Sequence, residues 1–293
     1  MINRGLTVEN KQYALHYFAT VGYYRLSGYT LLLETPGTFV TNANGVTMYQ
    51  RTHVFRPGAS FRELIDLYDL DRRLRLHILD AIERIEVAFR TILSNHMTLK
   101  YSDTHWYMQS THFGPKYDHN WLLQQVKRET RKNSPRKRNA FCNHYYQTYA
   151  SPNLPPVWMV AEQLSMGAWS QIYEKLKRSR DKKDVAREFN TGPGELASWM
   201  HALSYLRNLC AHHARLLKIN YVLLPRTSSA LPSTIDNKKF IIFAAVIHYL
   251  LHRVSPNSKW SVRTKDLLET FENLDHEDLL GFVDDWHKDG FWG

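Results

Sequence analysis

Apolar residues between Ser60 and Lys100 recur at three- and four-residue steps, which is the spacing of one face of an α-helix. Charged residues such as Arg72, Glu83 and Arg90 fill the positions between them. The pattern predicts a long amphipathic helix, continuous or broken once, that Ser60 opens as a cap. The apolar stripe consists of Leu64, Leu67, Leu74, Ile78, Ala81, Ile85, Ala88 and Ile92.

Helical spacing recurs along the rest of the chain. It predicts helices over about Val8–Val21 and Asn120–Tyr149, the second interrupted by "KNSPRKR", and a helix pair from Val157. Residues 35–58 are rich in Gly, Asn and Thr and favour a short hairpin around "VTMYQRTHVF". The run "KLKRSRDKKDVAR" is typical of a solvated helix surface or loop. We therefore expect one all-α helical bundle over residues 1–293, with an irregular hairpin insert near the N-terminus.

One apolar segment could be mistaken for a membrane span. The run "FIIFAAVIHYLL" is the longest of its kind, but it is too short to cross a bilayer core of roughly 30 Å. It predicts a buried helix. The first residues lack the apolar core of a leader peptide, and only two cysteines occur. We expect a cytoplasmic protein with no membrane partner.

The stretch "SYLRNLCAHHARLL", residues 204–217, combines an apolar helical period with many polar side chains. At about 100° per residue, one stripe roughly 80° wide gathers the apolar positions. That stripe holds Leu196, Trp199, Leu203, Leu206, Cys210, His213 and Leu217. The opposite face holds His201, Ser204, Tyr205, Asn208, His212 and Arg215.

The face assignment separates the two adjacent histidines. His213 falls on the apolar stripe and is predicted to be a core or interface residue, with Cys210 as a small buried hydrophobe beside it. His212 is the histidine that can reach solvent or a substrate, and Asn208 precedes it by one turn. Arg207 lies about 140° from His212 on an ideal helix, so a two-fold pairing of helices would be needed to bring their heads together.

The balance of charge favours an anionic partner. Lys and Arg number 38 against 28 Asp and Glu, a formal net charge of +10. A basic protein without such a partner remains the alternative. The C-terminal segment 264–289 is acidic, whereas the segment 127–138 is the most basic part of the chain and is predicted to contact phosphates. Its cations are Lys127, Arg128, Arg131, Lys132, Arg136, Lys137 and Arg138.

These residues suit cleavage of RNA without a metal. A histidine can take the proton of a ribose 2′-hydroxyl or give one to the leaving oxygen, and an arginine stabilises the developing charge on phosphate. The products would be a 2′,3′-cyclic phosphate and a 5′-hydroxyl end. No ligand pair has zinc spacing, and the helix faces point Cys210 and His213 away from His212. We therefore expect no metal and no other cofactor.

Several separated motifs resemble one known family. They are "VGYYRLSGY" at 21–29, "FRELIDLYDLDRRLRLHILDAIERIEVAFRT" at 61–91, "HWY" at 105–107, "ASWMHALSYLRN" at 197–208 and "RNLCAHHARL" at 207–216. In this order they resemble the Abi-like proteins of abortive phage infection, the AbiD/AbiF group, over about residues 3–220.

The resemblance implies a HEPN-type helical domain, whose R-x4-6-H motif forms the active site of many dimeric, metal-independent ribonucleases. Arg207 and His212 match that motif, and Asn208 fills the polar position after the arginine. Family members continue past the histidines with a tryptophan, an asparagine and an arginine, whereas this chain has "RLLKIN". The resemblance thus implies a homodimeric ribonuclease of phage defence, with Arg207, Asn208 and His212 as catalytic residues. Arg215, nearly one turn after His212 on the polar face, is predicted to be an RNA contact.

Two alternatives to catalysis stay open. Some HEPN-type proteins only bind RNA, and some relatives are toxins held in check by a small non-coding RNA, as in toxin–antitoxin pairs. A non-catalytic RNA-binding module is the first alternative, and a subunit that regulates a separate effector is the second. The segment "GYYRLSGY" is similarly open. Tyr23, Tyr24, Arg25 and Tyr29 could stack on and contact RNA, although a helix end packed on the long helix is favoured.

Overall fold

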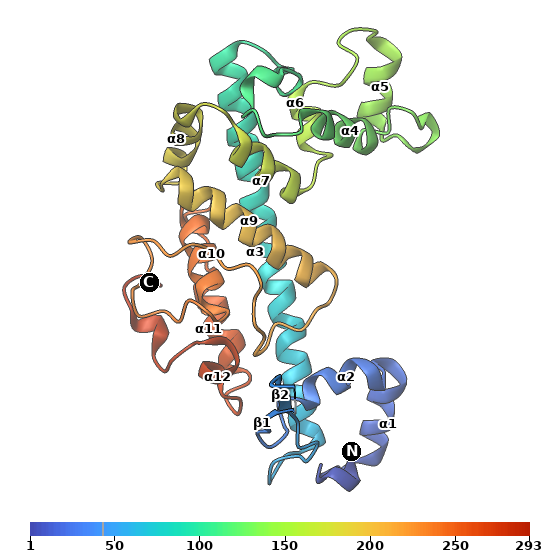
Figure 1. The fold of residues 1–293 in the computed structure, drawn as a ribbon, viewed down its shortest axis with the longest axis vertical. Helices are drawn as coiled ribbons and strands as arrows, with labels where there is room; N and C mark the ends of the chain where they lie inside the picture. Colours follow the sequence, from blue (N-terminus) through green and yellow to red (C-terminus); the bar gives the residue numbers. More distant parts are fainter. Residues whose placement is uncertain (43) are drawn as a thin grey trace.

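One long helix organises the molecule. The computed structural model describes residues 1–42 and 44–293. Helix α3 (Phe61–Tyr101) runs unbroken for 41 residues, which is about 60 Å at the usual rise per residue, and it forms the long axis in Figure 1. The Ser60 hydroxyl accepts the Glu63 N–H at 3.1 Å, so the predicted cap is confirmed. The helix ends at Ser102, which has a φ of 50°.

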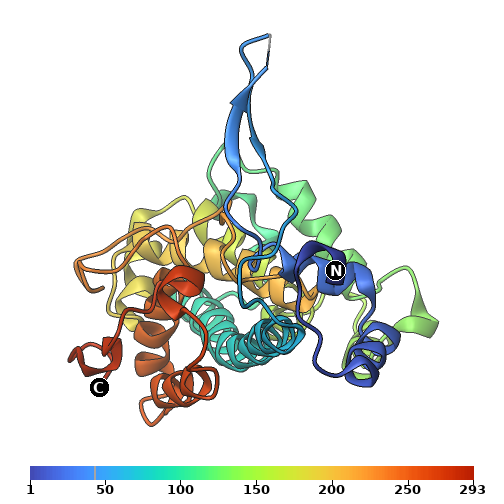
Figure 2. The ribbon, with the colours of Figure 1, turned by 90° about the horizontal axis from the view of Figure 1, so that it is seen from below.

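The core lies between α3 and the helices that pack along it. These are α9 (Pro193–Ala211), α10 (Ile241–Val254) and α11 (Trp260–Glu269), and Figure 2 shows them around α3 seen nearly end-on. Helix α7 (Met166–Lys175) in turn packs on α9. Indole rings fill this region, with Trp169, Trp199 and Trp260 fully buried. The apolar run before residue 252 forms most of α10 and is buried, as predicted.

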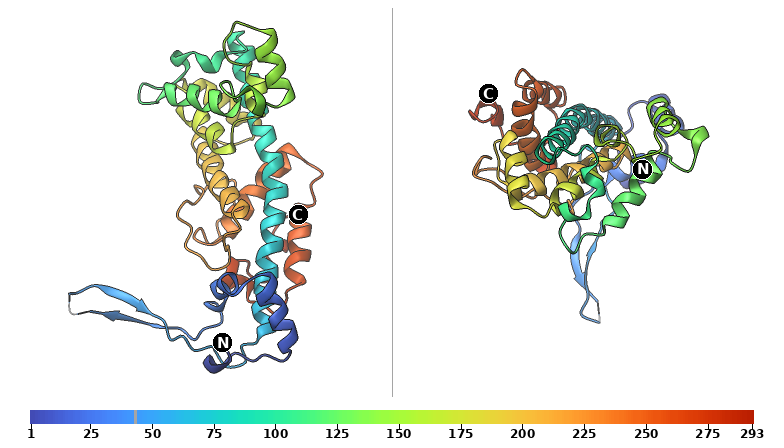
Figure 3. Two further views of the ribbon diagram at one scale, coloured as in Figure 1. Left: turned by 90° about the vertical axis from the view of Figure 1, so that its right-hand side faces the viewer. Right: turned by 90° about the horizontal axis from the view of Figure 1, so that it is seen from above.

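At one end of α3, two short helices and a hairpin carry the N-terminal part. Helix α1 (Lys11–Thr20) begins at the cap Asn10, slightly later than predicted, and α2 (Tyr23–Thr30) follows it directly. The predicted hairpin is present within residues 35–58, but "VTMYQRTHVF" supplies only its second strand. Its strands are β1 (Thr38–Thr41) and β2 (Thr47–Gln50), antiparallel with Phe39 opposite Tyr49. The hairpin projects away from the helices in Figure 3, and every strand residue is exposed.

The opposite end of α3 carries shorter helices. They are α4 (His119–Glu129), α5 (Ala140–Thr148) and α6 (Val157–Ala161). The segment "KNSPRKR" separates α4 from α5, as predicted, and contains a 3-10 turn at Pro135–Lys137. The charged run after α7 forms α8 (Ser179–Glu188). Helix α8 is not wholly solvated, because the carboxylate of Asp181 is buried and forms an ion pair with Lys100, with 2.6 Å between Lys100 Nζ and Asp181 Oδ1.

The predicted fold class is confirmed. Twelve α-helices and one two-stranded sheet account for the regular structure of the described residues. The acidic C-terminal segment contributes the end of α11, then α12 (His276–Leu280) and a 3-10 turn at Trp286–Lys288. Within the described residues, no helix combines the length and the apolar character that a membrane crossing requires.

Candidate active site at the end of helix α9

Helix α9 ends earlier than its apolar period predicts. Its last residue is Ala211, and His212 is the C-terminal cap. His213 has a φ of 57°, its N–H donates to the Cys210 carbonyl at 3.1 Å, and the Ala214 N–H donates to the Leu209 carbonyl at 2.9 Å. This is a Schellman motif with a histidine where glycine is usual. Extending the helix phase to Leu217 was therefore wrong.

The early end changes the status of His213. The prediction that His213 lies in the core is wrong, because His213 is exposed and lies beyond the helix; a place at an interface between chains stays a prediction. His212, by contrast, is exposed as predicted. Cys210 is buried as predicted, and burial raises the pKa of its thiol to about 12. On the predicted polar face, Ser204 is buried instead.

A buried carboxylate on α3 holds the segment after α9. Asp71 accepts the Leu216 N–H at 2.8 Å and the Tyr29 hydroxyl at 2.6 Å. It also pairs with Arg75 one turn along the helix, and the Arg75 guanidinium donates to the Ala214 carbonyl at 3.1 Å. Asp71 thus joins α2, α3 and the chain after His213 at one point.

The sequence contains a signal for this cluster that periodicity analysis missed. Asp71 sits between Leu67 and Leu74 at four- and three-residue steps, and so occupies the apolar stripe itself. Burial raises the pKa of Asp71 above its ordinary value, while the Arg75 guanidinium and the hydrogen bond from Tyr29 offset part of that increase. A carboxylate in an apolar stripe with an arginine at i+4 indicates a buried pair.

Arg207 lies close to Asn208, and not to His212. Its Nη1 donates to the Asn208 Oδ1 at 3.3 Å. Across the described chain, no hydrogen bond joins Arg207 to His212, and none is made by the His212 ring. Glu86 of α3 is half-buried nearby. Burial raises the pKa of the Glu86 carboxyl, and the charge of Arg207 offsets part of the rise.

Arg215, the predicted RNA contact, is half-buried and ties the segment after α9 to α2. Its Nη1 donates to the Gly28 carbonyl, and burial lowers the pKa of the guanidinium. Gly28 lies within α2. The packing interpretation of "GYYRLSGY" holds for Leu26 and Tyr29, which are buried. It is wrong for Tyr23 and Tyr24, which are exposed.

The basic segment 127–138 lies at the α4–α5 end of the molecule, whereas α2, to which Arg215 is hydrogen-bonded, lies toward the other end (Figure 1). Some cations of the basic segment make contacts within their own end of the molecule. Lys132 donates to the Asn153 carbonyl at 2.8 Å, and the Arg138 guanidinium lies 4.5 Å from the centre of the Tyr146 ring. Arg136 and Lys137 are exposed on the 3-10 turn. The structure thus does not bring this segment to the α9 end.

Comparison with protein families decides the relationship of the chain. The family model described as Abi-like protein matches residues 16–218, which is more than half of the sequence. The chain belongs to the Abi-like protein family. The match runs from α1 through α9 to Lys218 and so includes Arg207, Asn208 and His212. Abi-like membership indicates a role in abortive infection defence.

The Abi-like match stands alone among the comparisons. No curated protein and no solved structure matches the chain. Within the described residues, no group of three or more His, Cys, Asp and Glu side chains is arranged to hold a metal ion. The chemistry of this Abi-like protein must therefore be argued from the residues at the end of α9.

Proposed function

We propose that this Abi-like protein is an endoribonuclease of anti-phage defence that cuts RNA without a metal, using Arg207, Asn208 and His212. The observation that supports it most is the state of His212. Its exposed ring makes no hydrogen bond within the described chain, yet its backbone is fixed, because the His212 N–H donates to the Asn208 carbonyl at 3.0 Å. A positioned imidazole with both nitrogens available can act as a general acid or base.

The residues one turn earlier supply the remaining chemistry. Arg207 reaches Asn208 with one guanidinium nitrogen and keeps further N–H donors for a phosphate oxygen. Attack of the 2′-hydroxyl on the adjacent phosphorus breaks the P–O5′ bond. The base takes the hydroxyl proton, and the leaving 5′-oxygen receives a proton. The products carry a 2′,3′-cyclic phosphate and a 5′-hydroxyl.

A homodimer is part of the proposal. Arg207 and His212 do not contact each other within one chain, and the reaction needs a proton donor as well as a proton acceptor. The exposed face of α9 offers His201, Asn208 and His212 to a second copy. A two-fold axis near this face would place two histidines and two arginines around one phosphate.

RNA binding without cleavage is the second candidate function. The exposed cations Arg136 and Lys137 and the exposed rings of Tyr23 and Tyr24 favour it, because such groups bind phosphates and bases whether or not a bond is cut. In this version a small regulatory RNA is the partner, and His212 has no chemical role.

The deciding experiment is incubation of purified protein with end-labelled RNA in EDTA, followed by analysis of the product ends. The nuclease proposal predicts cuts that EDTA does not inhibit and that leave a cyclic phosphate. Tight binding without cuts would favour the second function. Analytical ultracentrifugation of the same sample tests the dimer, and a monomer that still cuts RNA at micromolar concentration would contradict it.

A further inference from the structure

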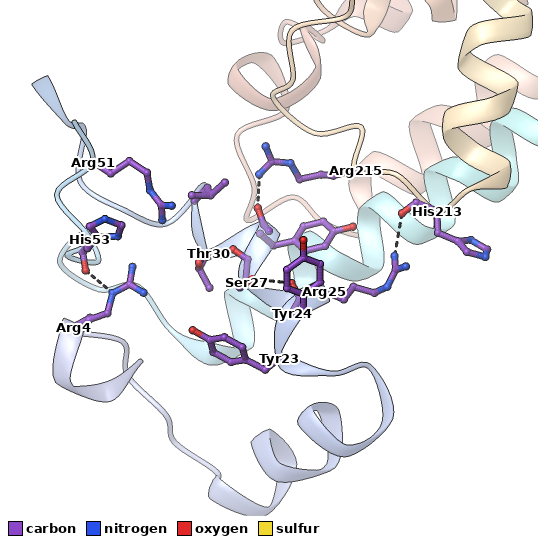
Figure 4. Close-up of a pocket in the computed structure, with 13 residues that line it drawn as sticks. Arg4, Tyr23, Tyr24, Arg25, Ser27, Thr30, Arg51, His53, His213 and Arg215 are labelled. Carbon is purple, nitrogen blue, oxygen red and sulfur yellow. Dashed lines mark hydrogen bonds between the residues drawn. The ribbon is translucent and has the colours of Figure 1, made fainter. Parts of the chain in front are cut away.

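A cavity of about 620 Å³ lies beside the end of α9. It opens between α2, the chain that leads from the hairpin back to α3, and the segment after α9, and Figure 4 shows side chains from all three around it. Its volume is in the range of small-ligand sites. The side chains that define its chemistry are Arg4, Tyr24, Arg25, Arg51, His53 and Arg215.

The cavity is cationic. Four arginines line it, and no Asp or Glu does. The buried carboxylate of Glu34 accepts from Arg51 at 2.6 and 3.0 Å and also pairs with Arg4, so one negative charge serves two guanidinium groups. Arg25 and Arg215 form no ion pair with any described residue. The four arginines and Glu34 carry a formal net charge of +3, and two of the arginines, Arg25 and Arg215, have no carboxylate partner among the described residues.

Backbone carbonyls hold the two unpaired guanidinium groups in place. Arg25 donates to the His213 carbonyl at 3.0 Å, and Arg215 donates to the Gly28 carbonyl, as Figure 4 shows. Each contact uses one nitrogen of a group that carries five N–H donors, and a carbonyl does not neutralise its charge. These cations are therefore positioned before any ligand binds, and phosphate is a ligand that guanidinium groups recognise.

Exposed aromatic rings stand beside these cations. Tyr24 is 91% exposed, although it lies on a helix whose next turns are fixed to α3 by Leu26 and Tyr29. No described residue hydrogen-bonds its hydroxyl. An exposed ring on a fixed helix backbone, next to unpaired arginines, is an arrangement that proteins use to stack a nucleic-acid base.

We propose that this cavity binds one nucleotide of single-stranded RNA, with its base stacked on Tyr24 and its phosphate on Arg25 and Arg215. The inference rests on the proposed function, for which RNA is the substrate. His213 lines the cavity and directly follows His212, so the bound nucleotide lies next to the nucleotides that reach the catalytic histidine. Duplex RNA does not fit, since its bases are already stacked on one another.

A second cavity supports a polymer as the ligand. It measures about 380 Å³, and Arg25 and His213 belong to the linings of both cavities. Its lining also contains Arg72 and Arg75. Arg75 is held by the buried Asp71, so the cation of this cavity that can contact the next phosphate of a strand is Arg72, whose side chain is 47% exposed although it lies 3.5 Å from Asp69; a free mononucleotide does not need that contact.

Binding measured in a His212→Ala background tests the proposal without cleavage. The probe is a short fluorescein-labelled oligouridylate, and its anisotropy reports affinity. Tyr24→Ala should weaken binding about tenfold, equivalent to about 1.4 kcal/mol, whereas Tyr24→Phe keeps the ring and should bind like the parent. Arg25→Gln retains a donor for the His213 carbonyl but removes the charge. It should reduce the salt slope by about one contact.

Two controls make the outcome decisive. Tyr24 is almost fully exposed, so circular dichroism should show an unchanged fold in its variants. Duplex RNA of the same length should be insensitive to Tyr24→Ala. Equal affinity of Tyr24→Ala and its parent, or no binding of the oligouridylate at all, would overturn the subsite even if the protein cuts RNA. Binding that depends on Tyr24 in a protein that never cuts would retain the subsite and reject the nuclease.

Discussion

Replacing Asp71 by asparagine should destabilise the protein far more than a single carboxylate usually does. The asparagine can still accept from Leu216 or Tyr29, but the Arg75 guanidinium, whose side chain is only 5% exposed, loses its carboxylate partner. Breaking a buried ion pair from one side costs about 3–5 kcal/mol. At about 2 °C per kcal/mol for a chain this long, Tm should fall by roughly 6–10 °C.

Urea denaturation followed by circular dichroism measures this loss. The matched control is Asp80→Asn, because Asp80 pairs with Arg84 at the same i,i+4 spacing on α3 but is 52% exposed. Asp80→Asn should lower the free energy of unfolding by less than about 1 kcal/mol. Adding Arg75→Gln to Asp71→Asn should recover at least about 1 kcal/mol by removing the unpaired charge. If Asp71→Asn and Asp80→Asn were equally mild, the buried pair would not hold α2 and the segment after α9.

Three further predictions concern stability and RNA binding. Burial and the Arg263 charge lower the pKa of His77 from 6.5 to about 4 in the folded protein. As pH falls, His77 therefore takes up its proton in the unfolded chain before it does so in the folded one, and the free energy of unfolding decreases between about pH 6.5 and 4. His77→Gln should remove up to about 3 kcal/mol of this dependence, and parallel stability profiles would contradict it. In urea denaturation, the free energy of unfolding of His213→Gly should exceed that of His213→Ala by about 1 kcal/mol, because glycine adopts a φ of 57° freely. The reverse order would argue against the left-handed cap. If the segment 127–138 contacts phosphates, alanine at Arg136, Lys137 and Arg138 should flatten the salt dependence of RNA affinity by about one per lost contact, and an unchanged slope would move binding elsewhere.

Periodicity predicted the long elements because their apolar positions repeat many times. Helix α3 carries its stripe over 41 residues, and the apolar run before residue 252 is too short for a membrane span, which leaves a buried helix. The end of α9 could not be predicted in the same way. Its apolar stripe continues through Cys210, His213 and Leu217, but no glycine marks the left-handed residue at which the helix stops.

The site was predictable only in part for a related reason. His212 faces solvent whether α9 ends at Ala211 or continues, so its exposure survived the error in helix length. The predicted position of His213 did not survive that error, because it depends on the hydrogen bonds that end the helix. The cavity beside it needs Arg25, Arg51 and Arg215 from three separate segments, and tertiary contacts bring them together: Asp71 joins α2 to the segment after α9, and Glu34 holds Arg51. Nothing in local sequence encodes that meeting.

The initial rate of RNA cleavage in EDTA by His212→Ala, compared with the wild-type protein, tests the central claim most directly. The account predicts a rate lower by about 100-fold or more. Unfolding free energy and affinity for RNA should stay nearly unchanged, because the His212 ring is exposed and makes no hydrogen bond within the described residues. A folded His212→Ala protein that cuts RNA at the wild-type rate would contradict the assignment of His212 as the catalytic histidine.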